Sequence, residues 1–225
     1  RRIKGEPVQY ILGATEFMGL EFKVDKRVLI PRPETEILVE AAIDRIKASG
    51  IASPEILDLG TGSGCIAVSL AKYIPDCKIT AIDISLEALE VAMRNAYLNQ
   101  ARIEFIRSDL FAALGSQRFD LIISNPPYVS TQELNTLAKE ISFEPVLALE
   151  AGFGGLDYYR RIISQVDSWL KEGGLLAFEV GQNQASQVRS MFGAQEKFDD
   201  VRIIKDYNDI QRVVIAKKRI LVEVQ

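Results

Sequence analysis

Short apolar runs alternate with helical patterns along most of this 225-residue chain, and this alternation limits the folds that it can adopt. Seven segments are predicted as strands: 56–57, 78–83, 103–107, 119–124, 175–180, 201–204 and 212–216. Four segments have apolar residues at helical spacing: 33–50, 66–74, 156–170 and 182–192. Strands that alternate with helices in this way predict an α/β fold with a doubly wound sheet.

The first fifty residues predict two further features. Two β-rich halves within residues 15–30, separated by Met18-Gly19, predict a β-hairpin. A proline begins the helical pattern at 33–50 and a glycine ends it, as is usual for helix termini. We therefore expect residues 1–32 to form a linker and hairpin, and residues 33–225 to form a single catalytic domain.

The stretch Asn125-Pro126-Pro127-Tyr128 directly follows the predicted strand at 119–124. Two consecutive prolines remove backbone donors, so the neighbouring carbonyl groups stay free to accept hydrogen bonds. A planar NH2 group can dock here, with its hydrogens accepted by the side-chain oxygen of Asn125 and the carbonyl of Pro126, and its face against Tyr128. Such docking aims the nitrogen lone pair at an electrophile and predicts methylation of a poorly nucleophilic nitrogen. The alternative is an ordinary turn, which Asn-Pro marks in many chains.

A glycine-rich turn, Asp58-Leu59-Gly60-Thr61-Gly62-Ser63-Gly64, joins the predicted strand at 56–57 to the predicted helix at 66–74. Glycines permit positive φ angles and let the backbone approach a ligand closely, and the free N–H groups of a helix start face a bound molecule. Such turns also bind NAD or only close tightly. The dinucleotide fingerprint needs Gly-x-Gly-x-x-Gly, whereas the third glycine comes one residue earlier here. This spacing favours S-adenosylmethionine over a pyrophosphate.

Two acids follow the next predicted strands. Asp83 ends the strand at 78–83, where a carboxylate can accept from both hydroxyls of a ribose. Its alternative role is that of a helix cap, because a helical pattern follows. Asp109 follows the third predicted strand and is placed to accept from an adenine amino group. Leu110 then offers apolar surface to the ring, and Phe111 does the same unless it belongs to the core.

These motifs occur in the order found in class I S-adenosylmethionine methyltransferases, and the chain most resembles the HemK family. Four further stretches carry the resemblance: Gly5-Glu6-Pro7-Val8-Gln9-Tyr10, Pro31-Arg32-Pro33-Glu34-Thr35-Glu36, Phe143-Glu144-Pro145 and Asp206-Tyr207-Asn208-Asp209-Ile210-Gln211-Arg212-Val213. The resemblance implies a Rossmann-like, seven-stranded, mostly parallel sheet that closes with an antiparallel pair and is preceded by the small hairpin.

The HemK family contains the N5-glutamine methyltransferases of peptide chain release factors. The resemblance therefore implies transfer of a methyl group from S-adenosyl-L-methionine to the glutamine of the Gly-Gly-Gln motif in class I release factors. It assigns the glycine turn, Asp83 and Asn125 to the cofactor, and residues 125–128 to the target glutamine. The stretch 31–36 separates this group from relatives that modify a glutamine of a ribosomal protein, which remain an alternative.

Two features depart from the family pattern. The chain begins at Arg1, where family members carry a preceding helical domain, so we expect a substrate-recognition part to be missing. Asn208 stands where the family commonly has glycine, and asparagine tolerates the left-handed conformation better than most residues. The stretch 217–225 has no functional interpretation.

Two other segments lie near the motifs. Arg32 directly precedes the predicted helix at 33–50, and we expect it to be solvated, with contact to the cofactor or the substrate as the alternative. The connection 129–155 is too long for a simple loop, so we expect it to form part of the substrate cleft.

Charge and composition narrow the expected partners. A net charge of −4 and a pI near 5.1 poorly match a chain that holds DNA by its phosphates. We therefore expect no stable nucleic-acid binding, and an adenine-N6 DNA methyltransferase, which shares Asn-Pro-Pro-Tyr, is the less favoured alternative. The chain has no histidine, and its two cysteines lack metal-ligand spacing, so no metal site is expected.

The sequence also bears on whether the protein is membrane-bound, exported or catalytically inactive. No apolar run approaches the ~18 residues of a membrane span, and no charged and apolar leader begins the chain. We therefore expect a cytoplasmic enzyme that does not bind membranes. A catalytically inactive binding module is the remaining hypothesis, and failure to bind S-adenosylmethionine would favour it.

Overall fold

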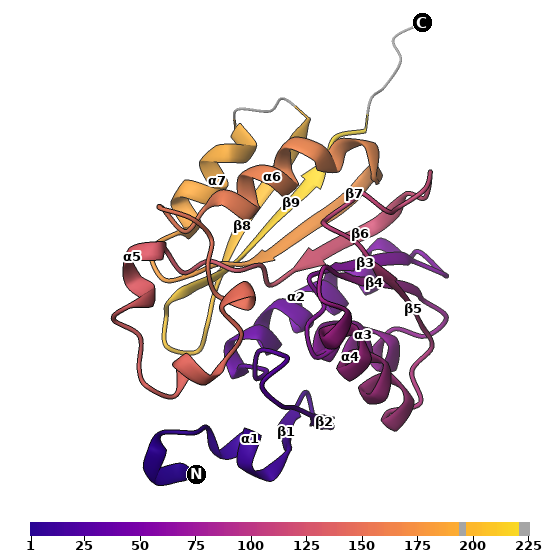
Figure 1. The fold of residues 1–225 in the computed structure, drawn as a ribbon. Coiled ribbons are helices and arrows are strands. Elements are labelled where there is room, and N and C mark those ends of the chain that lie inside the picture. Colours follow the sequence, from indigo (N-terminus) through magenta and orange to yellow (C-terminus); the bar gives the residue numbers. More distant parts are fainter. Residues whose placement is uncertain (194–196, 221–225) are drawn as a thin grey trace, which may run out of the picture.

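The computed structural model describes residues 1–193 and 197–220, with a seven-stranded sheet at its centre (Figure 1). In spatial order the strands are β5 (Ile103–Arg107), β4 (Lys78–Asp83), β3 (Glu55–Leu59), β6 (Phe119–Ser124), β7 (Leu170–Glu179), β9 (Gln211–Lys218) and β8 (Phe198–Lys205). Neighbours pair in parallel, except that β9 is antiparallel to both β7 and β8. The predicted α/β class, the mostly parallel sheet and the antiparallel pair at its end are confirmed. Residues 221–225 of the predicted domain lie outside the described part.

The strand order reverses between β3 and β6. The two strands pair in parallel, so both end at the same edge of the sheet, where the Ser124 hydroxyl donates to the carbonyl of Leu59 (2.7 Å). In open α/β sheets, ligands bind beyond the carboxyl ends of the strands at such a reversal. The glycine turn after β3 and Asn125 after β6 therefore meet at the edge where binding is expected.

Helices cover both faces of this sheet (Figure 1). One face carries α2 (Pro33–Ser49), α3 (Cys65–Tyr73) and α4 (Leu86–Leu98), and the other carries α6 (Asp157–Gln165) and α7 (Ala185–Gly193). Successive residues of β3 serve the two faces: Ile56 packs in the core beneath α2 and α3, and Leu57 packs in the core beneath α6 and α7. Within the described residues, no helix has the length and apolar character needed to cross a membrane.

A short helix, α1 (Val8–Leu12), and a hairpin of β1 (Ala14–Phe17) and β2 (Leu20–Lys23) precede the sheet. The hairpin is confirmed, but it is shorter than predicted. Its turn, Met18-Gly19, has positive φ at both residues (50° and 69°), as a two-residue turn between twisted strands requires. A turn follows the hairpin. It is stabilised by the Asp25 carboxylate, which accepts from the backbone N–H of Arg27 (3.0 Å).

Two predicted helices have different bounds in the structure. The segment 156–170 is not one helix, because α6 is followed by the 3₁₀ helix η4 (Val166–Ser168) and β7 begins directly afterwards. Lys171 donates to the Asp120 carboxylate on β6 (2.8 Å), which attaches this early part of β7 to the sheet. The other helix, α7, begins late because the side chain of Gln184 accepts a backbone N–H of the preceding turn (3.1 Å).

The long connection 129–155 contains a short helix, α5 (Thr131–Leu134), and two 3₁₀ helices, η2 (Ile141–Phe143) and η3 (Val146–Ala148). A parallel bridge between Val129 and Glu150 holds its two ends together. The connection is therefore an ordered loop over the binding edge of the sheet.

Candidate cofactor and substrate cavity

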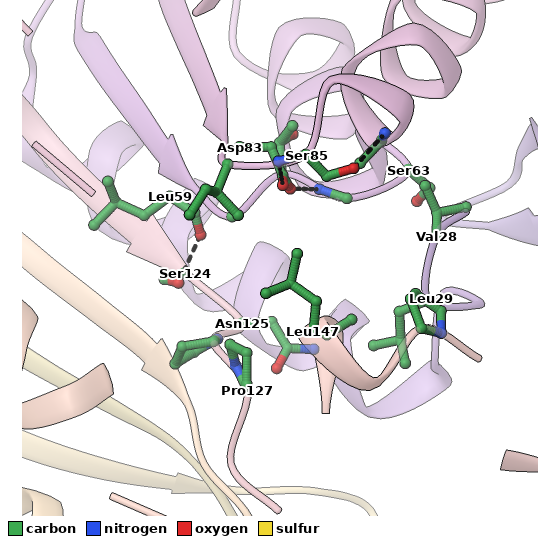
Figure 2. A pocket seen from close by; sticks show the side chains of 18 of the residues that line it. Val28, Leu29, Leu59, Ser63, Asp83, Ser85, Ser124, Asn125, Pro127 and Leu147 are labelled. Atoms are coloured by element: carbon green, nitrogen blue, oxygen red, sulfur yellow. Dashed lines mark hydrogen bonds between the residues drawn. The ribbon is translucent and has the colours of Figure 1, made fainter. Parts of the chain in front are cut away.

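A cavity of about 380 Å³ opens at the carboxyl ends of β3, β4 and β6 (Figure 2). Small-molecule sites commonly measure ~300–1,000 Å³. Ten of the predicted site residues line it: Gly60, Thr61, Gly62, Ser63, Asp83, Asp109, Leu110, Asn125, Pro126 and Pro127. Figure 2 shows Asp83 on one side of the cavity and Asn125 on the other. The three other predicted residues, Asp58, Gly64 and Tyr128, are not among its lining residues.

The three glycines of the turn have two different functions. All have positive φ, at 74° for Gly60, 53° for Gly62 and 82° for Gly64. A Cβ on Gly60 would meet no atom within 4 Å, so the cavity can admit a ligand close to this backbone. A Cβ on Gly64 would lie only 3.1 Å from the Cβ of Ala92. Gly64 therefore permits the close approach of α3 and α4, while the first glycine faces the cavity.

Asp58 supports the glycine turn from within the protein. Its side chain is fully buried, and its Oδ2 accepts from the hydroxyl of Thr61 (2.6 Å). Burial raises the pKa of Asp58 to about 7, against the Thr61 hydrogen bond. Its Oδ1 has no hydrogen-bond partner among the described residues. Asp58 therefore supports the glycine turn from beneath through Thr61.

Asp83 joins the glycine turn to the start of α4. Its Oδ2 accepts from the backbone N–H of Gly62 and its Oδ1 from that of Ser85, both at 2.9 Å. Burial raises the pKa of Asp83, and these backbone hydrogen bonds oppose that effect. The cap of α4 is Ser85, whose hydroxyl accepts from the N–H of Ala88 (3.2 Å). The carboxylate therefore lines the cavity with acceptor capacity remaining on each oxygen.

Asp109 and Leu110 lie beyond β5 at the far end of the cavity. Both oxygens of Asp109 accept from Nη2 of Arg161 on α6 (2.8 and 2.9 Å), a contact that the sequence did not predict. Leu110 has a positive φ of 48°, and the hydroxyl of Ser108 holds this turn by donating to the Leu110 carbonyl (2.7 Å). A branched side chain in this conformation is rare, and such strain is common at functional sites.

Phe111 belongs to the core. Its ring is buried and stacks on Trp169 with centroids 5.8 Å apart and planes 4° apart. Of the two roles considered for this side chain, the packing role is the one that the structure bears out.

Residues 125–127 line the cavity, whereas Tyr128 turns away from it. The Tyr128 carbonyl accepts from Nε2 of Gln184 (2.9 Å), and its ring packs against the core beneath α6 and α7. Burial raises the pKa of the Tyr128 hydroxyl to about 12. Tyr128 does not line the described cavity. The predicted contact of its ring with a target amide therefore stays a prediction.

Asn125 is held from behind by two buried side chains. Its Nδ2 donates to Oγ1 of Thr35 at the start of α2 (3.1 Å), and the Thr35 hydroxyl donates to Oε2 of Glu179 at the end of β7 (2.5 Å). Burial raises the pKa of Glu179 to about 7, and its Thr35 hydrogen bond opposes that effect. One N–H of the amide is therefore directed to Thr35, and the side chain of Asn125 lines the cavity.

Arg32 is only partly solvated, with its side chain 32% exposed. It lines the cavity and forms an ion pair with Glu144, whose side chain is 1% exposed. Oε2 of Glu144 also accepts from the backbone N–H of Ile30 (3.3 Å). A nearly buried carboxylate needs such partners, and the three residues fasten the connection 129–155 to the start of α2.

Sequence reasoning missed several residues of the cavity. Thr35 lies within the stretch 31–36, which was interpreted only as a family marker. Tyr158 and Ile162 line the cavity from α6, where their spacing of four residues places them on one helix face. Residues 145–148 line it from the long connection, as expected for a cleft. No group of three or more His, Cys, Asp or Glu that could hold a metal ion occurs among residues 1–193 and 197–220.

Comparison with known proteins identifies the family. The family model described as methyltransferase small domain matches residues 34–152. The release factor glutamine methyltransferases of Chlorobaculum tepidum and Geobacter sulfurreducens are each 46% identical to this chain, over 94% and 95% of it and 74% of each relative. The chain belongs to the release factor glutamine methyltransferase family. A solved protein-(glutamine-N5) methyltransferase (release factor-specific) from Alicyclobacillus acidocaldarius is 32% identical, with a TM-score of 0.54 over 88% of this chain and 99% of that chain.

Membership of the release factor glutamine methyltransferase family confirms the resemblance to HemK proteins and makes this chain a methyltransferase. Two of the motifs that carried the resemblance meet in one cavity, which is lined by residues 59–63 of the glycine turn and by residues 125–127. The roles predicted for individual residues within it remain predictions.

Proposed function

We propose that this methyltransferase transfers the methyl group of S-adenosyl-L-methionine to the side-chain amide nitrogen of the glutamine in the Gly-Gly-Gln motif of class I peptide chain release factors. The observation that carries the proposal is the Asn125 side chain, which lines a cavity bordered by a glycine turn while its amide nitrogen donates to Thr35. The names and 46% identity of the relatives support the choice of substrate.

The residues at the glycine-turn end of the cavity fit S-adenosyl-L-methionine. Gly60 leaves open space for a ligand, and the Asp83 carboxylate can accept from ribose hydroxyls. Leu110 and Ile82 add apolar surface among the lining residues, which suits an adenine ring. When bound, this cofactor supplies an electrophilic methyl group on a sulfonium.

The target amide would be held by acceptors. Oδ1 of Asn125 and the carbonyl of Pro126 can each accept one hydrogen of the planar NH2 group. The nitrogen gains positive charge as the new bond forms, so both hydrogen bonds strengthen in the transition state and favour catalysis over simple binding. Fixing the amide in line with the methyl group is worth on the order of 7–11 kcal/mol in favourable cases.

No strong base is required before transfer. The methylated nitrogen is acidic while it carries the extra proton, so that proton can leave to water. This agrees with a chain that contains no histidine. The residues of the cavity therefore act by orienting the amide and by accepting its hydrogens.

Other substrates have less support. A ribosomal-protein glutamine fits the same acceptor pair, but the relatives at 46% identity are named for release factors. An exocyclic adenine amine of DNA also fits chemically, yet the net charge of −4 does not favour a phosphate backbone as partner.

The proposal is tested by incubating the chain with S-adenosyl-L-methionine and a purified class I release factor, followed by peptide mass spectrometry. We expect one added methyl group on the glutamine of the Gly-Gly-Gln peptide. A ribosomal protein and an adenine-containing DNA duplex serve as competing substrates in parallel reactions. Methylation of either competitor, with none on the release factor, would overturn the proposal.

A further inference from the structure

Three side chains from distant parts of the chain meet behind the target site. Thr35 comes from the first turn of α2, Asn125 follows β6, and Glu179 ends β7. Thr35 and Glu179 are each only 2% exposed, yet Thr35 also borders the cavity. Nδ2 of Asn125 lies 3.1 Å from Oγ1 of Thr35, which lies 2.5 Å from Oε2 of Glu179.

The donors and acceptors of these three side chains determine the direction of the two hydrogen bonds. Above its pKa of about 7 Glu179 is ionised, and hydrogen bonds from both Thr35 and Asn125 favour this form. An ionised carboxylate only accepts, so the single hydrogen of the Thr35 hydroxyl is then directed to Glu179. The hydroxyl then has only lone pairs to offer to its other neighbour. Asn125 must therefore present its NH2 group to Thr35 and its carbonyl oxygen to the cavity.

We propose that Thr35 and Glu179 are positioning residues that hold the Asn125 amide with its oxygen toward the target nitrogen. This inference rests on the proposed function. An amide rotated by half a turn would present two N–H donors to the NH2 group of the target, and neither could accept its hydrogens. The buried pair excludes this unproductive orientation, so the rate depends on side chains that do not touch the transferred methyl group.

The variant Thr35→Val tests the inference because valine keeps the shape of threonine but removes the hydroxyl. We expect kcat to fall roughly 10- to 100-fold, since one orienting hydrogen bond is lost. The dissociation constant of S-adenosyl-L-methionine should stay within about threefold, because the cofactor contacts are elsewhere in the cavity. Thr35→Ser restores the hydroxyl and should recover most of the rate.

A matched control is Thr80→Val, which removes another buried threonine hydroxyl, on β4 and outside the cavity. Its kcat should equal that of the wild type. Thermal unfolding of each variant shows whether it is folded before its rate is compared. Equal kcat for Thr35→Val and Thr35→Ser, or a loss confined to cofactor affinity, would overturn the inference.

A readout without turnover separates this inference from the proposed function. Nuclear magnetic resonance of chains labelled with ¹⁵N-asparagine reports hydrogen exchange of the Asn125 NH2 group. We expect slow exchange in the wild type and in Thr35→Ser, and faster exchange in Thr35→Val. If the wild type methylates no release factor, the proposed function fails, while unchanged exchange in Thr35→Val would by itself refute the orienting bond.

Discussion

Asn125 and Asp83 are two cavity side chains with different positions and different hydrogen-bond partners. Both carry oxygen acceptors, but they lie on opposite sides of it (Figure 2). Asp83 is fixed by the backbone N–H groups of the glycine turn and of Ser85, whereas Asn125 is fixed by Thr35. Under the proposed function we expect the two acceptors to serve different ligands, so their replacement should change different kinetic constants.

Asn125→Ala should leave the fold and most of the cofactor affinity intact while it reduces methyl transfer by at least ~100-fold. The reason is that the variant loses an acceptor whose hydrogen bond strengthens in the transition state. Steady-state kinetics and isothermal titration with S-adenosyl-L-methionine measure the two effects. Asn208→Ala, at an exposed position, is the control and should behave as the wild type. A tenfold loss of cofactor affinity without a fall in kcat would contradict the role given to Asn125.

Asp83→Ala should mainly weaken cofactor binding. Loss of hydrogen bonds to a charged acceptor costs ~1.5–3 kcal/mol, which is roughly a 10- to 150-fold increase in the dissociation constant. At saturating cofactor, kcat should stay within a few fold of the wild type. Unchanged affinity with a large fall in kcat would show that the carboxylate acts in the chemical step instead.

The glycine turn shows that one sequence motif can serve two purposes. Gly60 faces open space, whereas Gly64 faces Ala92 across the contact of α3 with α4. Spacing alone predicted that all three glycines border the ligand. The distinction needs the position of α4, which follows a different strand and whose distance from the turn is not encoded in the motif.

Gly64→Ala should therefore lower stability more than it alters the chemistry. The new Cβ would lie 3.1 Å from that of Ala92, and the residue has a φ of 82°. Steric crowding and backbone strain would therefore both destabilise the folded state. We expect a loss of ~2–4 kcal/mol in the free energy of unfolding, measured by urea denaturation. Gly115→Ala is the control, because a Cβ there meets no atom within 4 Å and φ is not positive. An unchanged midpoint for Gly64→Ala would contradict the packing role.

The sequence predicted the strands well because each central strand is a short apolar run bounded by polar or glycine residues. β4, β5 and β6 have the predicted bounds. Predictions failed where a side chain far along the chain changes a local preference: Lys171 extends β7 by bonding Asp120, and Glu144 holds Arg32. The same limit concealed Thr35 and Glu179, since only the packed sheet brings them to Asn125.

Two of the carboxyl groups buried close to the cavity, Asp58 and Glu179, have raised pKa values, and both affect global stability. Burial raises the pKa of Asp58 to about 7, against its hydrogen bond from Thr61, and the pKa of Glu179 to about 7, against its bond from Thr35. In an unfolded chain such groups titrate near pH ~4. Between about pH 4 and pH 7 the folded state therefore binds more protons than the unfolded state.

Stability should consequently fall as the pH rises from about 4 to 7, and the contribution of these groups should be constant above that window. A pKa difference of about 3 for Asp58 corresponds to ~4 kcal/mol at most. Asp58→Asn removes this part, so its free energy of unfolding should decline less steeply with pH than that of the wild type. Replacement of the exposed Asp199 by Asn is the control and should keep the slope of the wild type. Parallel profiles for Asp58→Asn and the wild type would contradict the assignment.

The most direct measurement is a crystal structure of the chain with S-adenosylhomocysteine and a peptide containing Gly-Gly-Gln. The glutamine NH2 group should lie within ~2.7–3.2 Å of both Oδ1 of Asn125 and the carbonyl oxygen of Pro126. Its nitrogen should face the sulfur of the cofactor product. A peptide bound with its glutamine outside the cavity, or an Asn125 amide that directs NH2 toward the target, would contradict the account.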